Sequence, residues 1–248
     1  MDYGAMLSDS FSYVQEAVWG RWRRWFLLLV CMIIFPFLLG YIVRIYRGDR
    51  PAPELGQWGS LFVDGLKLFI IELLYVAPVI LLFIIAFLPF LSTLVSAGLF
   101  TPDAAGMTDA QAEVLFAAHP DILAAVGTML ILIIVAVILA IITGIFSFVG
   151  TIRFARTGLI SEGFNFSAIL ATIRKMGWIN YLLALIIIGV ASMVYGFVMN
   201  IVMIIPVAGF IIWFFLYPPL IIFVSRYAAL VYDHGEVPAM AYPGPPLS

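Results

Sequence analysis

Two ionisable side chains, Glu72 and Arg226, lie inside long apolar runs of this sequence. A charge in such a run is costly, so these residues are the first candidates for a function. Glu72 follows Lys67 by five residues and Arg226 precedes Asp233 by seven, which predicts similar depths. We predict that Glu72 and Arg226 form an ion pair that joins two helices. Snorkelling to the interface and a proton or ion relay are the alternatives.

The other chemically capable residues are few. His119 and His234 fall on opposite sides of the expected membrane, and Cys31 is the single cysteine, which excludes an internal disulfide. We find no Gly-x-Ser-x-Gly, His-Glu-x-x-His or glycine-rich phosphate loop. No cofactor, metal site or catalytic residue is therefore expected, and we predict that the protein is not an enzyme. The formal net charge of -2 gives no indication of nucleic-acid binding.

The composition places these residues in a membrane. Of the 248 residues, 65% are hydrophobic and 10% are charged, whereas soluble domains carry about 25% charged residues. This predicts an all-α integral membrane protein with about four transmembrane helices. The long apolar runs are residues 25–43, 68–98, 123–152, 181–205 and 207–232.

The distribution of charge predicts the orientation. Residues 68–152 contain no lysine or arginine, and the acidic loop 101–122 lies between two apolar runs. By the positive-inside rule this loop is external and the C-terminus is cytoplasmic, in the cell membrane. Thr108 and Gln111 have the spacing of a capping box, which predicts a short helix over 109–118. The expected cytoplasmic elbows carry Arg44, Arg47, Lys67, Arg153, Arg156, Arg174 and Lys175.

The first apolar run has arginines at both ends and Pro36 in its middle. This pattern favours an N-terminal re-entrant hairpin, and a fifth, Pro-kinked span of 19 residues is the alternative. Residues 1–24, rich in tryptophan and arginine near their end, are predicted to lie in the membrane interface. We therefore expect one polytopic membrane domain over 25–234 and a disordered cytoplasmic tail over 235–248.

Small residues recur at helical spacing in the third and fourth apolar segments. They predict close packing of the two helices, or a substrate cavity beside Asn200. The two stripes are Ala136, Ala140, Gly144 and Ser147, and Gly189, Ser192, Gly196 and Asn200.

Two further stretches of the sequence resemble each other, and we call this similarity the internal echo. In both, two arginines three residues apart end an apolar segment and a glycine follows, as in Arg44, Arg47 and Gly48 and again in Arg153, Arg156 and Gly158. Such an echo is compatible with a duplicated helix, basic elbow and helix, as in transporters, and with chance.

The stretches LLGYIVRIYRG and PAPELGQWGSLFVDGLKLFII over residues 38–71 carry a more specific pattern. The Gly-Tyr followed by basic residues, and then Trp-x-x-Leu-Phe-x-x-Gly-Leu-Lys over 58–67, resemble a largely archaeal multi-pass membrane family catalogued as domain of unknown function 4013. The later YLLALIII and RYAALVY stretches look like its C-terminal half. The resemblance implies the fold and brings no catalytic residues.

These features favour a non-enzymatic membrane scaffold or accessory subunit. A transporter or channel for a small or lipophilic solute is the main alternative, and a lipid-modifying enzyme is a weaker one. The expected partners are the lipid bilayer and a membrane protein partner or a second copy of this chain.

Overall fold

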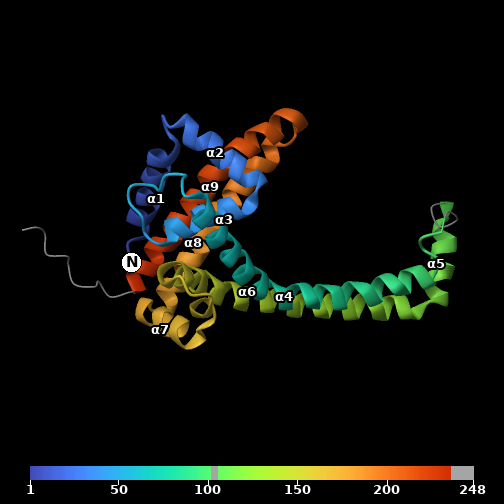
Figure 1. Ribbon diagram of the computed structural model, residues 1–248. Coiled ribbons are helices and arrows are strands. Elements are labelled where there is room, and N and C mark those ends of the chain that lie inside the picture. The colour runs from blue at the N-terminus through green and yellow to red at the C-terminus, as the bar shows by residue number, and fades with distance from the viewer. Residues whose placement is uncertain (102–105, 236–248) are drawn as a thin grey trace, which may run out of the picture. The chain divides into compact units, whose positions relative to one another are not determined.

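The computed structural model describes residues 1–101 and 106–235, and over these ranges the regular elements are helices without a strand (Figure 1). This confirms the all-α class. The helices are α1 (Tyr3–Val18), α2 (Trp22–Ile33), α3 (Phe35–Tyr46), α4 (Trp58–Ser96), α5 (Asp109–Ala118), α6 (Pro120–Thr157), a 3-10 helix (Ile160–Phe164), α7 (Phe166–Met176), α8 (Trp178–Val202) and α9 (Pro206–Gly235). The predicted tail beyond Gly235 and the loop residue Asp103 lie outside the described residues.

Four of these helices, α4, α6, α8 and α9, are long and apolar enough to cross a membrane. Each contains most or all of one of the predicted apolar runs from residue 68 onward: the run 68–98 extends two residues past the end of α4, and the run 181–205 extends three residues past the end of α8. Their surfaces carry many exposed leucine, isoleucine, valine and phenylalanine side chains. Such surfaces suit lipid and would be unfavourable in water.

The first apolar run forms two helices. The helix breaks at Ile34, whose φ of -105° and ψ of 74° are not helical, and Pro36 lies in the first turn of α3. α2 and α3 have 12 residues each, about 18 Å of helix against a core of about 30 Å, and they contact each other. The run therefore forms two short helices that are separated at Ile34. Its re-entrant position in the membrane stays a prediction.

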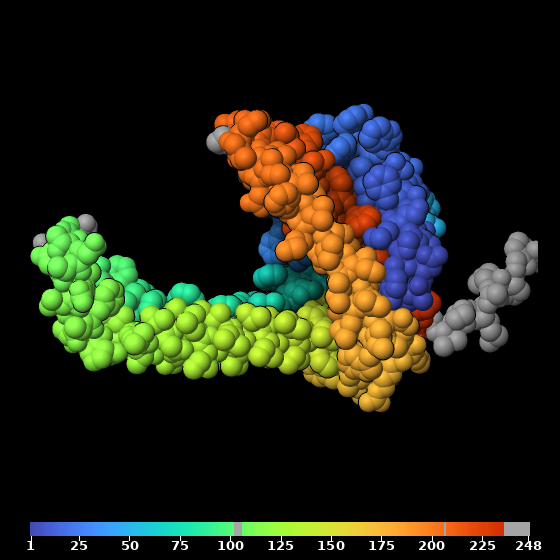
Figure 2. Space-filling view, turned by 180° about the vertical axis from the view of Figure 1, so that it is seen from behind, coloured from blue at the N-terminus to red at the C-terminus, as the bar shows by residue number. Residues whose placement is uncertain are grey.

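The described residues form two compact units, and the single membrane domain over 25–234 stays a prediction. The first unit holds residues 1–72 and those from 146 onward, and the second holds 73–145. In the first unit, α1 packs along α9, seen in Figure 2 as the blue segment beside the red one. Tyr13, Leu28, Tyr41, Leu61 and Ile222 belong to its buried core.

The α3 and α4 helices approach each other at two glycines. A Cβ atom added at Gly65 would collide with the carbonyl oxygen of Pro36, and one added at Gly40 would collide with that of Leu61. Only glycine leaves room for backbones this close. Gly65 is the glycine of the Trp58 to Lys67 motif, so the motif marks a helix crossing.

The second unit is a helical hairpin. The later half of α4 and the first half of α6 run alongside each other, and α5 lies between them in the chain (Figure 1). Ala86 and Ala136 are buried in this unit. The predicted capping box begins α5, because the Thr108 and Gln111 side chains each accept a hydrogen bond from the other's backbone N–H. This confirms the short helix over Asp109–Ala118.

Candidate functional site

Arg226 of α9 is 5% exposed, and its Nε donates a hydrogen bond to Oδ1 of Asp9 on α1 at 2.9 Å. The other Asp9 oxygen accepts a hydrogen bond from Arg50 at 2.5 Å. The Arg226 guanidinium also lies 5.0 Å from the ring centroid of Tyr13, within the range of a cation–π contact. The structure thus corrects the predicted pairing of Arg226 with Glu72. Its carboxylate partner comes from α1, because that helix packs along α9.

Glu72 takes part in none of the ion pairs found among residues 1–101 and 106–235. It is half-buried on α4 and acts electrostatically on the Tyr46 phenol. Burial raises the pKa of Tyr46, the charge of Glu72 raises it further, and a hydrogen bond with Ser225 lowers it. Since Ser225 precedes Arg226 on α9, Tyr46 is a neighbour that Glu72 and α9 share.

The other arginines of the predicted elbows are mostly paired inside the chain. Arg47 donates to Asp64 at 2.7 Å. We call the following contacts the elbow ion pairs: Arg47–Asp64, Arg50–Asp9–Arg226, Arg153–Glu162 and Arg156–Asp233. Two of these contacts join helices that are far apart in the sequence, since Asp9–Arg226 joins α1 with α9 and Arg156–Asp233 joins α6 with α9. Their geometry therefore ties the ends of several helices together.

The two halves of the internal echo touch each other. Nε of Arg47 donates to the carbonyl oxygen of Ala155 at 3.2 Å. A Cβ atom at Gly48 would lie 2.9 Å from Nη1 of Arg156. Gly48 and Gly158 both follow the ends of their helices with positive φ, at 87° and 76°. The helices that come after the two halves differ. The first half is followed by the continuous helix α4, whereas the second half is followed by α7 and α8, which are separated at Gly177.

The remaining elbow cations have other surroundings. Arg44 donates to the carbonyl oxygens of Glu54 at 2.8 Å and Gly56 at 2.7 Å, so it holds the linker that precedes α4. Lys67 is half-buried, and Arg174 and Lys175 are exposed at the end of α7. No ion pair of the described part of the chain includes these last three residues.

Two titratable groups outside the spanning helices illustrate the local electrostatics. The hydrogen bond from Arg153 lowers the pKa of Glu162, and a second one from Asn165 acts in the same direction. Burial raises the pKa of Tyr13 to about 12, against the attraction of Arg226. Both groups therefore keep one protonation state at neutral pH.

Neither of the two predicted small-residue stripes is buried along its whole length. On α6 Ala136 is buried and Ser147 is half-buried, whereas Ala140 and Gly144 are exposed. On α8 Ser192 and Gly196 are half-buried, whereas Gly189 and Asn200 are exposed.

The surroundings of the α8 stripe are open. A Cβ atom at Gly189 or Gly196 would meet no described atom within 4 Å, so these glycines mark no close crossing. Asn200 donates to the carbonyl oxygen of Gly196 at 2.8 Å and lines an open cavity of about 220 Å³ with Tyr195 and Trp213.

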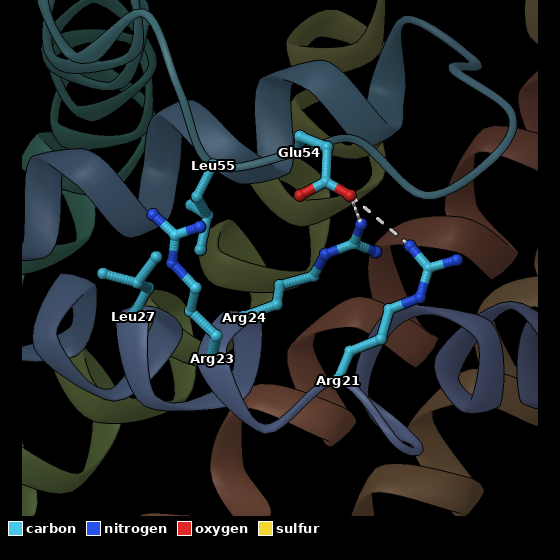
Figure 3. Close-up of a pocket in the computed structure, with 6 residues that line it drawn as sticks. All are labelled: Arg21, Arg23, Arg24, Leu27, Glu54 and Leu55. Atoms are coloured by element: carbon cyan, nitrogen blue, oxygen red, sulfur yellow. Dashed lines mark hydrogen bonds and ion pairs between the residues drawn. The ribbon is translucent and has the colours of Figure 1, made fainter.

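A second set of arginines gathers where α2 begins. Arg21, Arg23 and Arg24 line a cavity of about 310 Å³ with Glu54, and Leu27 and Leu55 complete its wall. Figure 3 shows Arg24 and Arg21 reaching toward Glu54, with dashed lines for the ion pairs, and Arg23 ending apart from it. We call this cavity the arginine pocket. His, Cys, Asp and Glu side chains form no cluster of three suited to a metal ion in the described ranges.

Sequence reasoning missed three residues that organise these sites: Asp9, Glu54 and Gly65. Asp9 lay in the segment assigned to the membrane interface, and Glu54 lay in a proline-rich linker. One signal was available for Glu54, since it is the acid of a proline-containing stretch, residues 51–57, that follows arginines on both sides of the first apolar run.

Comparison with known proteins gives one match. A family model described as "Protein of unknown function (DUF4013)" matches residues 25–205, which is more than half of the 248 residues. No curated protein and no solved structure matches. The matched range holds the α3–α4 glycine crossing and the two touching elbows. The chain belongs to the DUF4013 family.

Proposed function

We propose that this protein is a non-enzymatic scaffold or accessory subunit of the cell membrane. The observation that carries the proposal is the set of elbow ion pairs. Arginines and acids that converge in the first unit neutralise one another and join helix ends. Catalysis or transport uses polar groups that remain available to a substrate, whereas these groups are used to hold the fold.

The apolar surface of the second unit supports a role in binding other helices. Along α6, Leu130, Ile131, Ile134 and Ile138 are each more than half exposed. Such a hairpin can pack against further membrane helices through shape alone, because lipid provides no hydrophobic drive for association. The proposed partner is another membrane protein or a second copy of this chain.

The proposed orientation follows from the charges. All lysines and arginines lie outside residues 68–152, and α5 with its acidic flanks lies between the two halves of the second unit. This supports cytoplasmic elbows and a cytoplasmic C-terminus. A cysteine at Gly106 should react with an impermeant thiol reagent from outside, once Cys31 has been replaced. Labelling of Gly106→Cys from the cytoplasmic side alone would show that the orientation is the reverse of the proposed one.

A transporter is the second candidate, and Glu72 is the observation that favours it. This carboxylate lies in a spanning helix and has no ion pair among the described residues. Carboxylates in such positions carry protons or ions in pumps and transporters.

Reconstitution separates the two candidates. The full chain is placed in liposomes that contain a pH-sensitive dye, and proton flux is compared with empty liposomes and with the Glu72→Gln variant. The scaffold proposal predicts the same leak in all three. In parallel, cysteines at Ile134 and Ile138 should cross-link to a partner helix, unlike a cysteine at the buried Ala136. If the wild type shows proton flux and Glu72→Gln abolishes it, the transporter proposal would replace the scaffold proposal.

A further inference from the structure

The arginine pocket differs from the elbow ion pairs in its balance of charge. Its lining includes three cations, Arg21, Arg23 and Arg24, and one carboxylate, Glu54. Arg24 is 4% exposed, yet its Nε has no hydrogen-bond partner among the described residues. A buried donor without a partner is costly. The residues that line the pocket therefore leave it with excess positive charge.

Arg23 is available for a ligand. It is exposed, and no ion pair of the part of the chain described includes it. Figure 3 shows its guanidinium beside Leu27 and Leu55, at the apolar wall of the pocket. A planar guanidinium can donate two parallel hydrogen bonds to a phosphate group.

An exposed apolar stripe runs along the same helix, and Arg23 lies at its edge, three residues before Phe26 and seven before Val30. Trp22, Phe26, Val30 and Ile33 are 62%, 55%, 52% and 76% exposed, and their spacing places them on one face of α2. Trp22 stacks on Trp25, with ring centroids 5.4 Å apart. Tryptophan at the end of an apolar stripe is typical of the level of lipid headgroups.

We propose that the arginine pocket binds the phosphate of an anionic phospholipid, whose acyl chains lie along the apolar stripe of α2. The excess cations recognise the anionic headgroup, and the stripe gives the reason for a lipid over a free anion. A zwitterionic lipid presents the same phosphate together with its own cation, which the arginines repel. Binding here would fix the N-terminal hairpin against the membrane.

The test uses the full chain in neutral detergent and a fluorescent phosphatidylglycerol, with phosphatidylcholine as the zwitterionic control. The wild type should prefer phosphatidylglycerol, and Arg23→Gln should weaken its binding about tenfold, as expected for the loss of one charge-assisted contact. Arg174→Gln is the matched control, because Arg174 is an exposed arginine that does not line the arginine pocket. It should keep the preference.

A second variant guards against effects on folding. Glu54→Gln removes the carboxylate that competes for Arg21 and Arg24, so the folded variant should bind phosphatidylglycerol at least as tightly as the wild type. Equal weakening by Arg23→Gln and Arg174→Gln would overturn the proposal in favour of general surface charge. Displacement of the lipid by an equal concentration of inorganic phosphate would also overturn it, because the site would then be one for a free anion.

Discussion

Residues 73–145 contain no lysine or arginine, whereas the unit formed by residues 1–72 and those from 146 onward holds all twelve. The two units also pack differently. The first has buried charges in defined pairs and a glycine crossing between α3 and α4. The second is a hairpin whose apolar side chains are largely exposed.

This difference shows where the sequence specifies one arrangement of helices. Ion pairs and close backbone contacts are directional, so they fix how helices are turned toward each other. Apolar contacts between two helices are less specific, and lipid can replace many of them. Substitutions in the first unit should therefore be costly where equivalent ones in the second are tolerated.

The largest effect is expected at Asp9. Asp9→Asn leaves the buried Arg226 without its carboxylate, which should lower the free energy of unfolding by about 3 kcal/mol. The value lies at the low end for buried pairs because the Asp9 side chain is 26% exposed. Thermal unfolding in detergent measures the loss. Glu113→Gln, an exposed acid of the second unit, is the control and should change stability by less than about 0.5 kcal/mol.

Glycine-to-alanine substitutions should change the free energy of unfolding in opposite directions in the two units. Gly65→Ala forces its Cβ against the carbonyl oxygen of Pro36, and the required shift should cost about 1 to 3 kcal/mol. Gly127→Ala in α6 meets no described atom within 4 Å and gains helix propensity of up to about 1 kcal/mol. Unfolding midpoints of both variants check the prediction. A loss of stability in Gly127→Ala equal to that in Gly65→Ala would remove the distinction between the units.

A smaller effect on stability is expected when the pH is lowered, at the Arg153–Glu162 pair. Because Arg153 lowers the pKa of Glu162, this pair stabilises the fold above the ordinary Glu pKa of 4.5, and the contribution is lost as pH falls through the lowered value. The difference in unfolding midpoint between the wild type and Glu162→Gln should therefore shrink between about pH 6 and about pH 3. A constant difference over this range would show that ionised Glu162 does not contribute.

Local and one-dimensional features of the fold could be predicted from the sequence. The four spanning helices followed from apolar runs of sufficient length, because a bilayer requires them. The helix Asp109–Ala118 followed from Thr108 and Gln111, since a capping box is contained in four neighbouring residues.

The partners of buried charges could not be predicted in this way. Matching Glu72 to Arg226 by depth leaves the rotation of each helix about its axis undetermined, and Asp9 lies 217 residues from Arg226 in the sequence. The undetermined rotation of the helices also prevented a correct prediction of which glycines lie at close helix contacts. Spacing placed Gly189 and Gly196 on one face of α8, whereas close approach occurs at Gly40 and Gly65.

The most direct test of the Asp9–Arg226 contact is a double-mutant cycle on the free energy of unfolding, with Asp9→Asn and Arg226→Gln as the single variants. The structure predicts a coupling between the two substitutions of about 1 to 3 kcal/mol. The cycle of Glu72→Gln with Arg226→Gln should be additive within about 0.5 kcal/mol. Additivity in the first cycle together with coupling in the second would contradict the pairing of α1 with α9 and restore Glu72 as the partner of Arg226.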